Sequence, residues 1–128
     1  MKTISSLKKI ADTIFSIFIR KKYADHRGYV KCYTCGVVRM WNDRMQCGHF
    51  NSRRIGALRY EPRNCRVQCM GCNYMARGNY GKFAANLIRE CGEEEILWLD
   101  EQASQPFRFT IEGLENIIEY FRNEVAKL

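Results

Sequence analysis

The sequence predicts a small α+β domain, in which a compact core of two strands and a short helix is flanked by helices at both ends. Three observations predict this class. Two Cys-x-x-Cys pairs bracket a single histidine, His49. The insert between the pairs is long enough to fold by itself, and apolar residues recur at helical spacing near both ends of the chain. At 128 residues, the chain fits one domain, residues 1–128, with a modest core.

The N-terminal part, residues 1–28, is predicted to be a helix over residues 4–23. Apolar side chains form one stripe, with lysines and an aspartate opposite. The stripe consists of Ile4, Leu7, Ile10, Ala11, Ile14 and Phe18. We expect the stripe to pack on the core of its own chain, although a dimerisation face would show the same spacing.

Residues 29–80 are predicted to form the core. Residues 29–32 read as a strand, and residues 37–41 and 45–50 as a hairpin around a polar turn, with His49 on its outgoing strand. Residues 51–60 are basic and aperiodic, and we interpret them as a loop across the mouth of a site. After Asn73, we expect one or two helical turns.

The C-terminal part, residues 81–128, is predicted to be helical. One helix ends at Gly92, and the three glutamates that follow suit the N-terminus of the next helix. The segment around Ser104 and Pro106 is expected to be a linker, after which Thr110 caps a last helix. The outer face of this last helix is acidic.

The paired cysteines predict a structural zinc site. A Cys-x-x-Cys turn holds two thiolates on one side, which is half of a tetrahedral site, and two such turns complete it. The predicted ligands are Cys32, Cys35, Cys69 and Cys72. Four protein ligands leave no position for water, so this zinc is expected to stabilise the chain and to take no part in chemistry. We interpret Cys47 and Cys65 as core thiols, although either could replace one of the four, and Cys91 as structural.

The residues of the core resemble a known family. The arrangement Gly48-His49, Asn64 and Cys69-x-x-Cys72-Asn73 resembles the HNH (ββα-metal) endonucleases. More narrowly, the chain resembles the NinG (Rap) recombination nucleases of lambda-like bacteriophages. That resemblance rests on the strings Gln46-Cys47-Gly48-His49-Phe50, Arg59-Tyr60-Glu61-x-x-Asn64-Cys65-x-x-Gln68-Cys69-x-x-Cys72-Asn73 and Gly78-Asn79.

The resemblance implies a nuclease that acts on branched DNA recombination intermediates, with a zinc-stabilised ββα core and a catalytic Mg²⁺ or Mn²⁺ ion. By position, His49 matches the general base of these enzymes. Asn64 matches the residue that ties the loop together and orients the base, and Asn73 matches a ligand of the catalytic metal. Many HNH enzymes have a metal ligand at the position of Gly48. The second ligand is therefore left open between Asp43, Gln46 and a phosphate oxygen of the substrate.

The distribution of charge points independently to a nucleic acid as the partner. The net charge is +7, and residues 20–90 hold 15 basic and 4 acidic side chains, whereas residues 91–128 hold 3 and 9. A basic core attracts a polyanion, because each phosphate that it neutralises releases counterions. Guanidinium groups suit phosphate oxygens, so Arg53 and Arg54 are the expected phosphate clamps. Further DNA-binding candidates are Arg59, Arg63 and Arg77.

The sequence shows no secretory signal pattern and no run of the ~18–20 apolar residues that a membrane span needs. We therefore expect the thiols to be reduced and metal-bound in the cytoplasm. If the chain is phage-encoded, this is the cytoplasm of a bacterial host. Paired cuts in a four-way junction would favour a homodimer. Two other functions fit the motifs: a non-catalytic zinc-ribbon DNA-binding module with His49 as a structural ligand, and a basic protein-interaction module.

Overall fold

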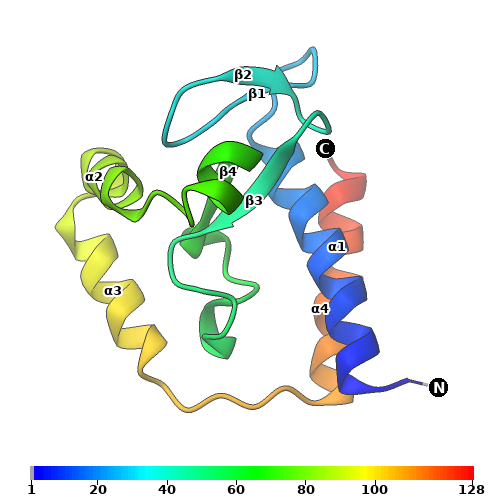
Figure 1. Ribbon diagram of the computed structural model, residues 1–128. Coiled ribbons are helices and arrows are strands. Elements are labelled where there is room, and N and C mark those ends of the chain that lie inside the picture. Colours follow the sequence, from blue (N-terminus) through cyan, green and yellow to red (C-terminus); the bar gives the residue numbers. More distant parts are fainter. Residues whose placement is uncertain (1) are drawn as a thin grey trace.

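The computed structural model describes residues 2–128 and confirms the mixed α+β class (Figure 1). Helices surround two small antiparallel sheets. The helices and strands are α1 (Ile4–Lys22), β1 (Tyr29–Lys31), β2 (Val38–Met40), β3 (Met45–His49), β4 (Cys65–Cys69), α2 (Tyr80–Cys91), α3 (Glu93–Ala103) and α4 (Ile111–Ala126). Single turns of other helix types cover Gly56–Leu58, Pro62–Asn64 and Gly71–Met75. None of the helices within residues 2–128 has the length and apolarity to cross a membrane.

Helix α1 packs on the rest of its own chain, as its apolar stripe predicts. It begins in a capping box of Thr3 and Ser6, and it runs beside α4 in the same direction (Figure 1). The rings of Phe15 and Phe121 meet edge to face, with centroids 4.9 Å apart. The stripe is rotated slightly from the predicted one, because Phe15 is buried while Ile10 stays 44% exposed.

The predicted hairpin between residues 37–41 and 45–50 is wrong. Strand β2 pairs with β1, and β3 pairs with β4, each antiparallel. The first Cys-x-x-Cys turn itself connects β1 to β2, with the Cys32 N–H donating to the Val37 carbonyl at 2.8 Å and Gly36 at a φ of +83°. Since this turn already gives β2 a partner, β3 is left to pair with the strand that leads into the second cysteine pair.

The β3–β4 ladder separates the functional side chains into two faces. Successive side chains of a strand point to opposite faces of the sheet. Cys47 and His49 therefore lie on one face of β3, and Gln46 and Gly48 lie on the other. The first of these faces lies against α1, where Phe15 contacts the His49 ring at a centroid distance of 6.1 Å. The ladder runs from the pair Met45 and Cys69 to the pair His49 and Cys65.

The C-terminal elements follow the predicted order. Helix α2 ends before Gly92, and α3 begins with three glutamates. The linker follows α3, and the Thr110 hydroxyl accepts the N–H of Gly113 at 3.0 Å to cap α4. Buried side chains of α2 and α3 pack beneath the loop between β3 and β4. After β4 there is one wide helical turn, Gly71–Met75, which agrees with the short helical stretch expected there.

Candidate functional site

The four cysteines of the two Cys-x-x-Cys pairs converge. Their sulfur atoms lie within 4.8 Å of one another, so that one ion could be held by all four. Two come from the turn between β1 and β2, one from the end of β4 and one from the turn that follows β4. Cys35 is exposed, and the other three are buried. The cluster therefore has the composition and closure of a structural zinc site.

Hydrogen-bond donors surround these sulfurs. The Cys72 N–H donates to Cys69 Sγ at 3.4 Å, Asn79 Nδ2 lies 3.7 Å from Cys72 Sγ, and the Thr34 hydroxyl lies 3.5 Å from Cys32 Sγ. Burial opposes ionisation of Cys32, but hydrogen bonds from the Cys69 backbone and the Thr34 hydroxyl lower its pKa to about 6. These donors favour the thiolate form of Cys32, which is the form that binds zinc.

Gln68 braces the cysteine cluster from within. Its side chain is fully buried, and its Nε2 donates to Thr34 Oγ1 at 3.1 Å and to the Gly78 carbonyl at 2.8 Å. It thereby joins the segments that carry the two cysteine pairs. The side chain crosses Gly48 so closely that a Cβ there would lie 2.0 Å from Gln68 Oε1. This contact explains why the residue before His49 has no side chain.

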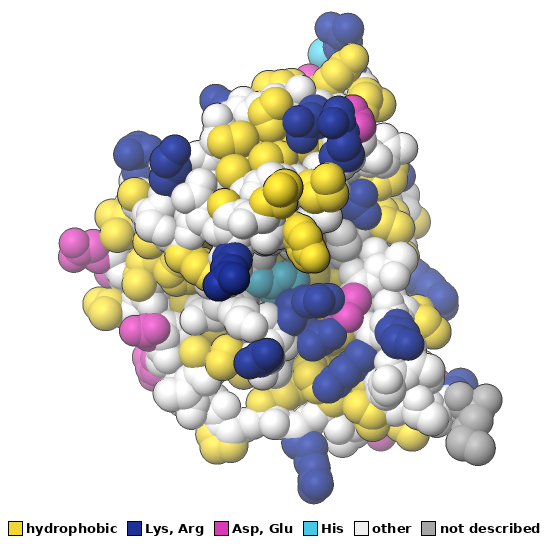
Figure 2. Space-filling model, in the orientation of Figure 1, with side chains coloured by type: hydrophobic (Ala, Val, Ile, Leu, Met, Phe, Trp, Pro, Cys, Tyr) yellow, Lys and Arg dark blue, Asp and Glu magenta, His cyan; other side chains and the backbone are white. Residues whose placement is uncertain are grey.

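A pocket of about 600 Å³ lies between α1, β3, the loop that follows β3 and the turn Gly71–Met75. Figure 2 shows a hollow on this face with a histidine inside and Lys and Arg side chains around it. The pocket is lined by Asp12, Phe15, Ser16, Gln46, Cys47, His49, Ser52, Arg53, Arg54, Arg59, Asn73, Tyr74 and Tyr80. Two of the three predicted catalytic residues, His49 and Asn73, are thus brought to one cavity from different elements.

His49 is held in its neutral form with one nitrogen free. Its Nε2 lies 2.8 Å from the Arg59 carbonyl. A carbonyl oxygen can only accept, so Nε2 carries the hydrogen, and Nδ1 keeps a lone pair when the ring is neutral. Burial lowers the pKa of His49 below its usual value, and Arg53 adds to this effect. The ring can therefore accept a proton near neutral pH.

Asn64 ties down the loop between β3 and β4. It is fully buried beneath the loop, where its Oδ1 accepts the Asn51 N–H at 2.9 Å. Its Nδ2 donates to the Asn51 carbonyl at 3.0 Å and to the Leu58 carbonyl at 3.3 Å. These hydrogen bonds join Asn64, at one end of the loop, to Asn51 near its other end and to Leu58 within it, and Asn64 does not line the pocket. Asn64 could therefore affect a reaction in the pocket only by fixing the conformation of the loop.

Asn73 has an amide neighbour in the pocket. Its Nδ2 donates to Gln46 Oε1 at 2.7 Å, which leaves the Asn73 carbonyl oxygen available to a cation. Of the side chains left open as a second metal ligand, Gln46 is therefore the one beside Asn73. Asp43 instead pairs with Arg44 on the surface and is absent from the pocket lining.

Asp12 organises the pocket wall, a role that the sequence pattern does not predict. Its carboxylate accepts from Arg59 Nε at 3.0 Å, from Arg59 Nη2 at 2.6 Å and from the Tyr60 hydroxyl at 2.9 Å. Arg53 lies 3.5 Å away. Arg59 is thus committed to anchoring the loop on α1. The only signal in the sequence was an acidic residue on the polar side of a helix whose other charged residues are all basic.

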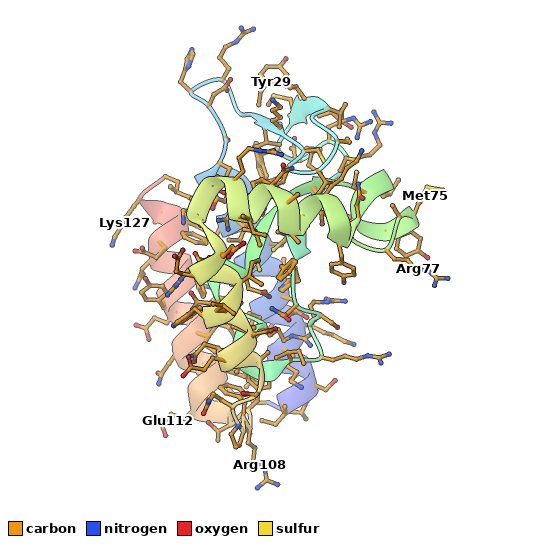
Figure 3. The ribbon with its side chains drawn as sticks, turned by 90° about the vertical axis from the view of Figure 1, so that its left-hand side faces the viewer. Tyr29, Met75, Arg77, Arg108, Glu112 and Lys127 are labelled. Carbon is orange, nitrogen blue, oxygen red and sulfur yellow. The ribbon has the colours of Figure 1, made fainter. Side chains whose placement is uncertain are left out.

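The remaining predicted DNA-binding arginines differ in position. Arg54 is exposed at the pocket and takes part in no ion pair within residues 2–128. Arg63 lies over the Trp98 ring, 3.5 Å from its centroid, and pairs with Glu95. Arg77 projects into solvent beyond α2 (Figure 3). Of the five predicted arginines, which all lie in the described part of the chain, Arg53, Arg54 and Arg59 line the pocket.

Comparison with known proteins identifies the family. The family model for the Bacteriophage Lambda NinG protein matches residues 1–128. The chain belongs to the NinG family. Among curated NinG proteins, it is 26% identical over 121 residues to that of Escherichia phage lambda and 25% identical over 121 residues to that of Escherichia phage 933W.

Each of these alignments covers 94% of this chain but only 56% and 57% of the respective relative, so the chain spans little more than half their length. No solved structure matches the chain. The predicted membership of the NinG family is therefore confirmed, whereas membership of the HNH superfamily stays a prediction.

This NinG-family chain contains a second group of potential metal ligands. Ligand atoms of Cys47, His49 and Cys65 lie within 4.8 Å of one another. Cys65 is fully buried, and Cys47 is half-buried at the pocket. From the sequence, both are expected to be core thiols. The structure shows that they also face the one histidine in the pocket, a juxtaposition that linear spacing did not reveal.

Proposed function

We propose that this NinG-family chain is a metal-dependent DNA endonuclease of the HNH type, acting on branched recombination intermediates. The observation that carries the proposal is the pocket itself: His49 and Asn73, delivered by different elements, line one cavity beside Arg53 and Arg54. A base, an amide oxygen and phosphate-binding cations in one cavity are what phosphodiester hydrolysis needs.

His49 serves as the general base. Its Nε2–H is held by the Arg59 carbonyl, so Nδ1 takes the proton from the attacking water. The Arg59 carbonyl is in turn fixed because the Arg59 side chain is locked to Asp12 on α1. The loop that Asn64 ties down therefore sets the orientation of the imidazole.

Asn73 and Gln46 are the residues that would hold a catalytic Mg²⁺ or Mn²⁺ ion, together with phosphate oxygens of the DNA. Amide and phosphate oxygens are ligands that these hard cations accept. When bound, the ion stabilises the negative charge that grows on the leaving oxygen. The four-cysteine cluster, carrying zinc, holds the strand and the turn that deliver these two amides.

Two exposed aromatic rings support a preference for branched DNA. Tyr74 and Tyr80 line the pocket, and their exposed fractions are 77% and 47%. Unpaired bases stack on such rings, whereas the bases of an intact duplex are already stacked on one another. A flap or a displaced single strand next to the pocket would present such bases to these rings.

A cleavage assay tests the proposal. Wild-type protein is incubated with four-way junctions, flaps and linear duplex in Mg²⁺, Mn²⁺ or no divalent ion. We expect metal-dependent nicking that is strongest on branched DNA. His49→Ala and the bulkier His49→Gln should each lower the rate about 10²–10⁴-fold while DNA binding persists.

The control is His26→Ala, since His26 is exposed and lies outside the pocket. A fully active His49→Gln would exclude His49 as the base. Wild-type protein that binds all these DNAs and cuts none would identify a non-catalytic DNA-binding module instead.

A further inference from the structure

We propose that Cys47, His49 and Cys65 form a second metal site, specific for thiophilic cations such as Zn²⁺, Cd²⁺ or Co²⁺. Two thiolates and one imidazole are soft and borderline ligands, which select these ions over Mg²⁺. Cys47 and His49 line the pocket, so a fourth coordination position would open toward it. This site is separate from the four-cysteine cluster and shares no residue with it.

The β3–β4 ladder brings the three side chains together. His49 lies directly opposite Cys65, and Cys47 is two residues earlier on the same face of β3. Their ligand atoms lie within 4.8 Å of one another. Zinc bonds of about 2.0–2.3 Å in a tetrahedron place the ligand atoms roughly 3.5–3.8 Å apart. A contraction of about 1 Å, within the reach of side-chain rotation, closes the site.

The imidazole is already oriented as a metal ligand. Histidines that bind metals usually donate their other ring N–H to a carboxylate or a backbone carbonyl. The Arg59 carbonyl occupies that position, 2.8 Å from His49 Nε2. Nδ1 is therefore the nitrogen left for the cation, and the loop that carries Arg59 is fixed by its ion pair with Asp12.

The two sites can be filled together. The four-cysteine cluster includes Cys69, opposite Met45 at one end of the ladder, and the second site includes Cys65, opposite His49 at the other end. Four residues of a strand span about 13 Å. At that distance, the ligand shells do not overlap, so full loading predicts two thiophilic ions per chain.

Occupation of the second site has a consequence that rests on the proposed function. His49 Nδ1 cannot bind a cation and accept a proton from water at the same time. A thiophilic ion would therefore switch off the base without displacing the Mg²⁺ or Mn²⁺ ion that Asn73 and Gln46 would hold. Cleavage would become sensitive to free zinc through Cys47 and Cys65.

Metal stoichiometry tests the site without any activity measurement. Purified protein is loaded with Zn²⁺ or Cd²⁺, freed of excess ion by gel filtration and measured by elemental analysis, with cadmium–thiolate absorption as a second readout. We expect two ions for wild type and for Cys91→Ser, whose cysteine lies outside both groups. Cys47→Ser and the buried Cys65→Val should each retain one ion.

Wild type that holds one ion would overturn the proposal, as would a folded Cys47→Ser that still holds two. Cys47 is half-buried, so this variant is the one expected to keep the fold, and circular dichroism verifies it.

The second arm measures nicking in Mg²⁺ against rising zinc, with each variant compared with its own rate in Mg²⁺ alone. Cys47→Ser should need at least tenfold more zinc than wild type for half-inhibition, and equal sensitivity would overturn the inhibitory role. A wild type that binds two ions but never cuts DNA would leave the metal site standing and reject the proposed function.

Discussion

At the scale of single residues, Asp12 determines how the pocket is built. It is one of few acidic groups near the basic loop, and it binds Arg59, Tyr60 and, at 3.5 Å, Arg53. Burial opposes the ionisation of Asp12, but hydrogen bonds from Arg59 and Tyr60 outweigh it and lower the pKa of its carboxyl. The stabilisation that follows is present above the unfolded pKa of about 3.9 and is lost only as pH falls through the still lower folded value.

Asp12→Asn should therefore lower the free energy of unfolding by about 1–3 kcal/mol, because the Arg59 guanidinium loses its charged partner. The loss should stay constant from pH 8 to pH 5, since Asp12 is ionised throughout that range. Urea unfolding at several pH values measures it. Asp43→Asn is the control, because its ion pair with Arg44 is exposed and is worth at most about 1 kcal/mol. A loss that fades between pH 7 and pH 5 would contradict the lowered pKa.

At the scale of elements, the β3–β4 ladder links the cysteine cluster to the pocket. The same strand carries Gly48, which accommodates the brace Gln68, and His49, which faces the cavity. The ladder tolerates no side chain at Gly48 because Gln68 already fills that space. Packing against Gln68 therefore determines the residue at position 48, next to the proposed base His49.

Gly48→Ala should destabilise the protein by about 1–3 kcal/mol, because its Cβ would overlap Gln68 Oε1 and force a shift of Gln68 or of β3. Gly81→Ala is the matched control: a Cβ there meets no atom within 4 Å, and alanine favours the helix that this residue helps to begin. Thermal unfolding compares the two variants. Equal melting temperatures for the two would show that the close approach at Gly48 is easily relieved.

At the scale of the whole molecule, two helical layers enclose sheets that are too small to be stable alone. Strands β1 and β2 have three residues each, and the segments that carry the four cysteines meet at these sheets. Structural zinc contributes about 10–16 kcal/mol in small domains, which equals or exceeds the total stability of a typical domain. Metal binding and folding of this core should therefore be coupled.

Removing zinc at neutral pH with a strong chelator should abolish the cooperative unfolding transition and expose the cysteine thiols. Cys72→Ser should reproduce this loss, because it removes a buried ligand, whereas the exposed Cys91→Ser should not. Near-UV circular dichroism and thiol titration follow the change. A metal-free protein that keeps its cooperative transition would show that the cysteine cluster does not hold the fold together.

The basic pocket face should make DNA binding dependent on salt. Arg54→Ala removes an exposed cation at the pocket, so the slope of log affinity against log salt should fall by about one. Arg108→Ala is the control, because Arg108 is exposed at the lower end of the view in Figure 3 and does not line the pocket. Titrations of labelled DNA at several salt concentrations measure both slopes. Equal reductions in the two variants would place the DNA elsewhere.

Much of this molecule could be predicted from the sequence by itself. The periodicity of α1, the cap at Thr110 and the end of α2 at Gly92 depend on neighbouring residues, and all three agree with the structure. The convergence of the paired cysteines was predictable too, because each Cys-x-x-Cys turn supplies half of a metal site.

Only the tertiary structure decided which strands pair. The polar turn between β2 and β3 suits a hairpin, but its residues do not reveal that β2 pairs with β1 and β3 with β4. The tertiary structure also decided that Asp12 locks Arg59, that Gln46 lies beside Asn73 and that Cys47 and Cys65 face His49. These contacts join residues that are distant in sequence or lie on different strands. Their physical basis is the packing of α1 against the β3–β4 ladder, which leaves no periodic signal in the chain.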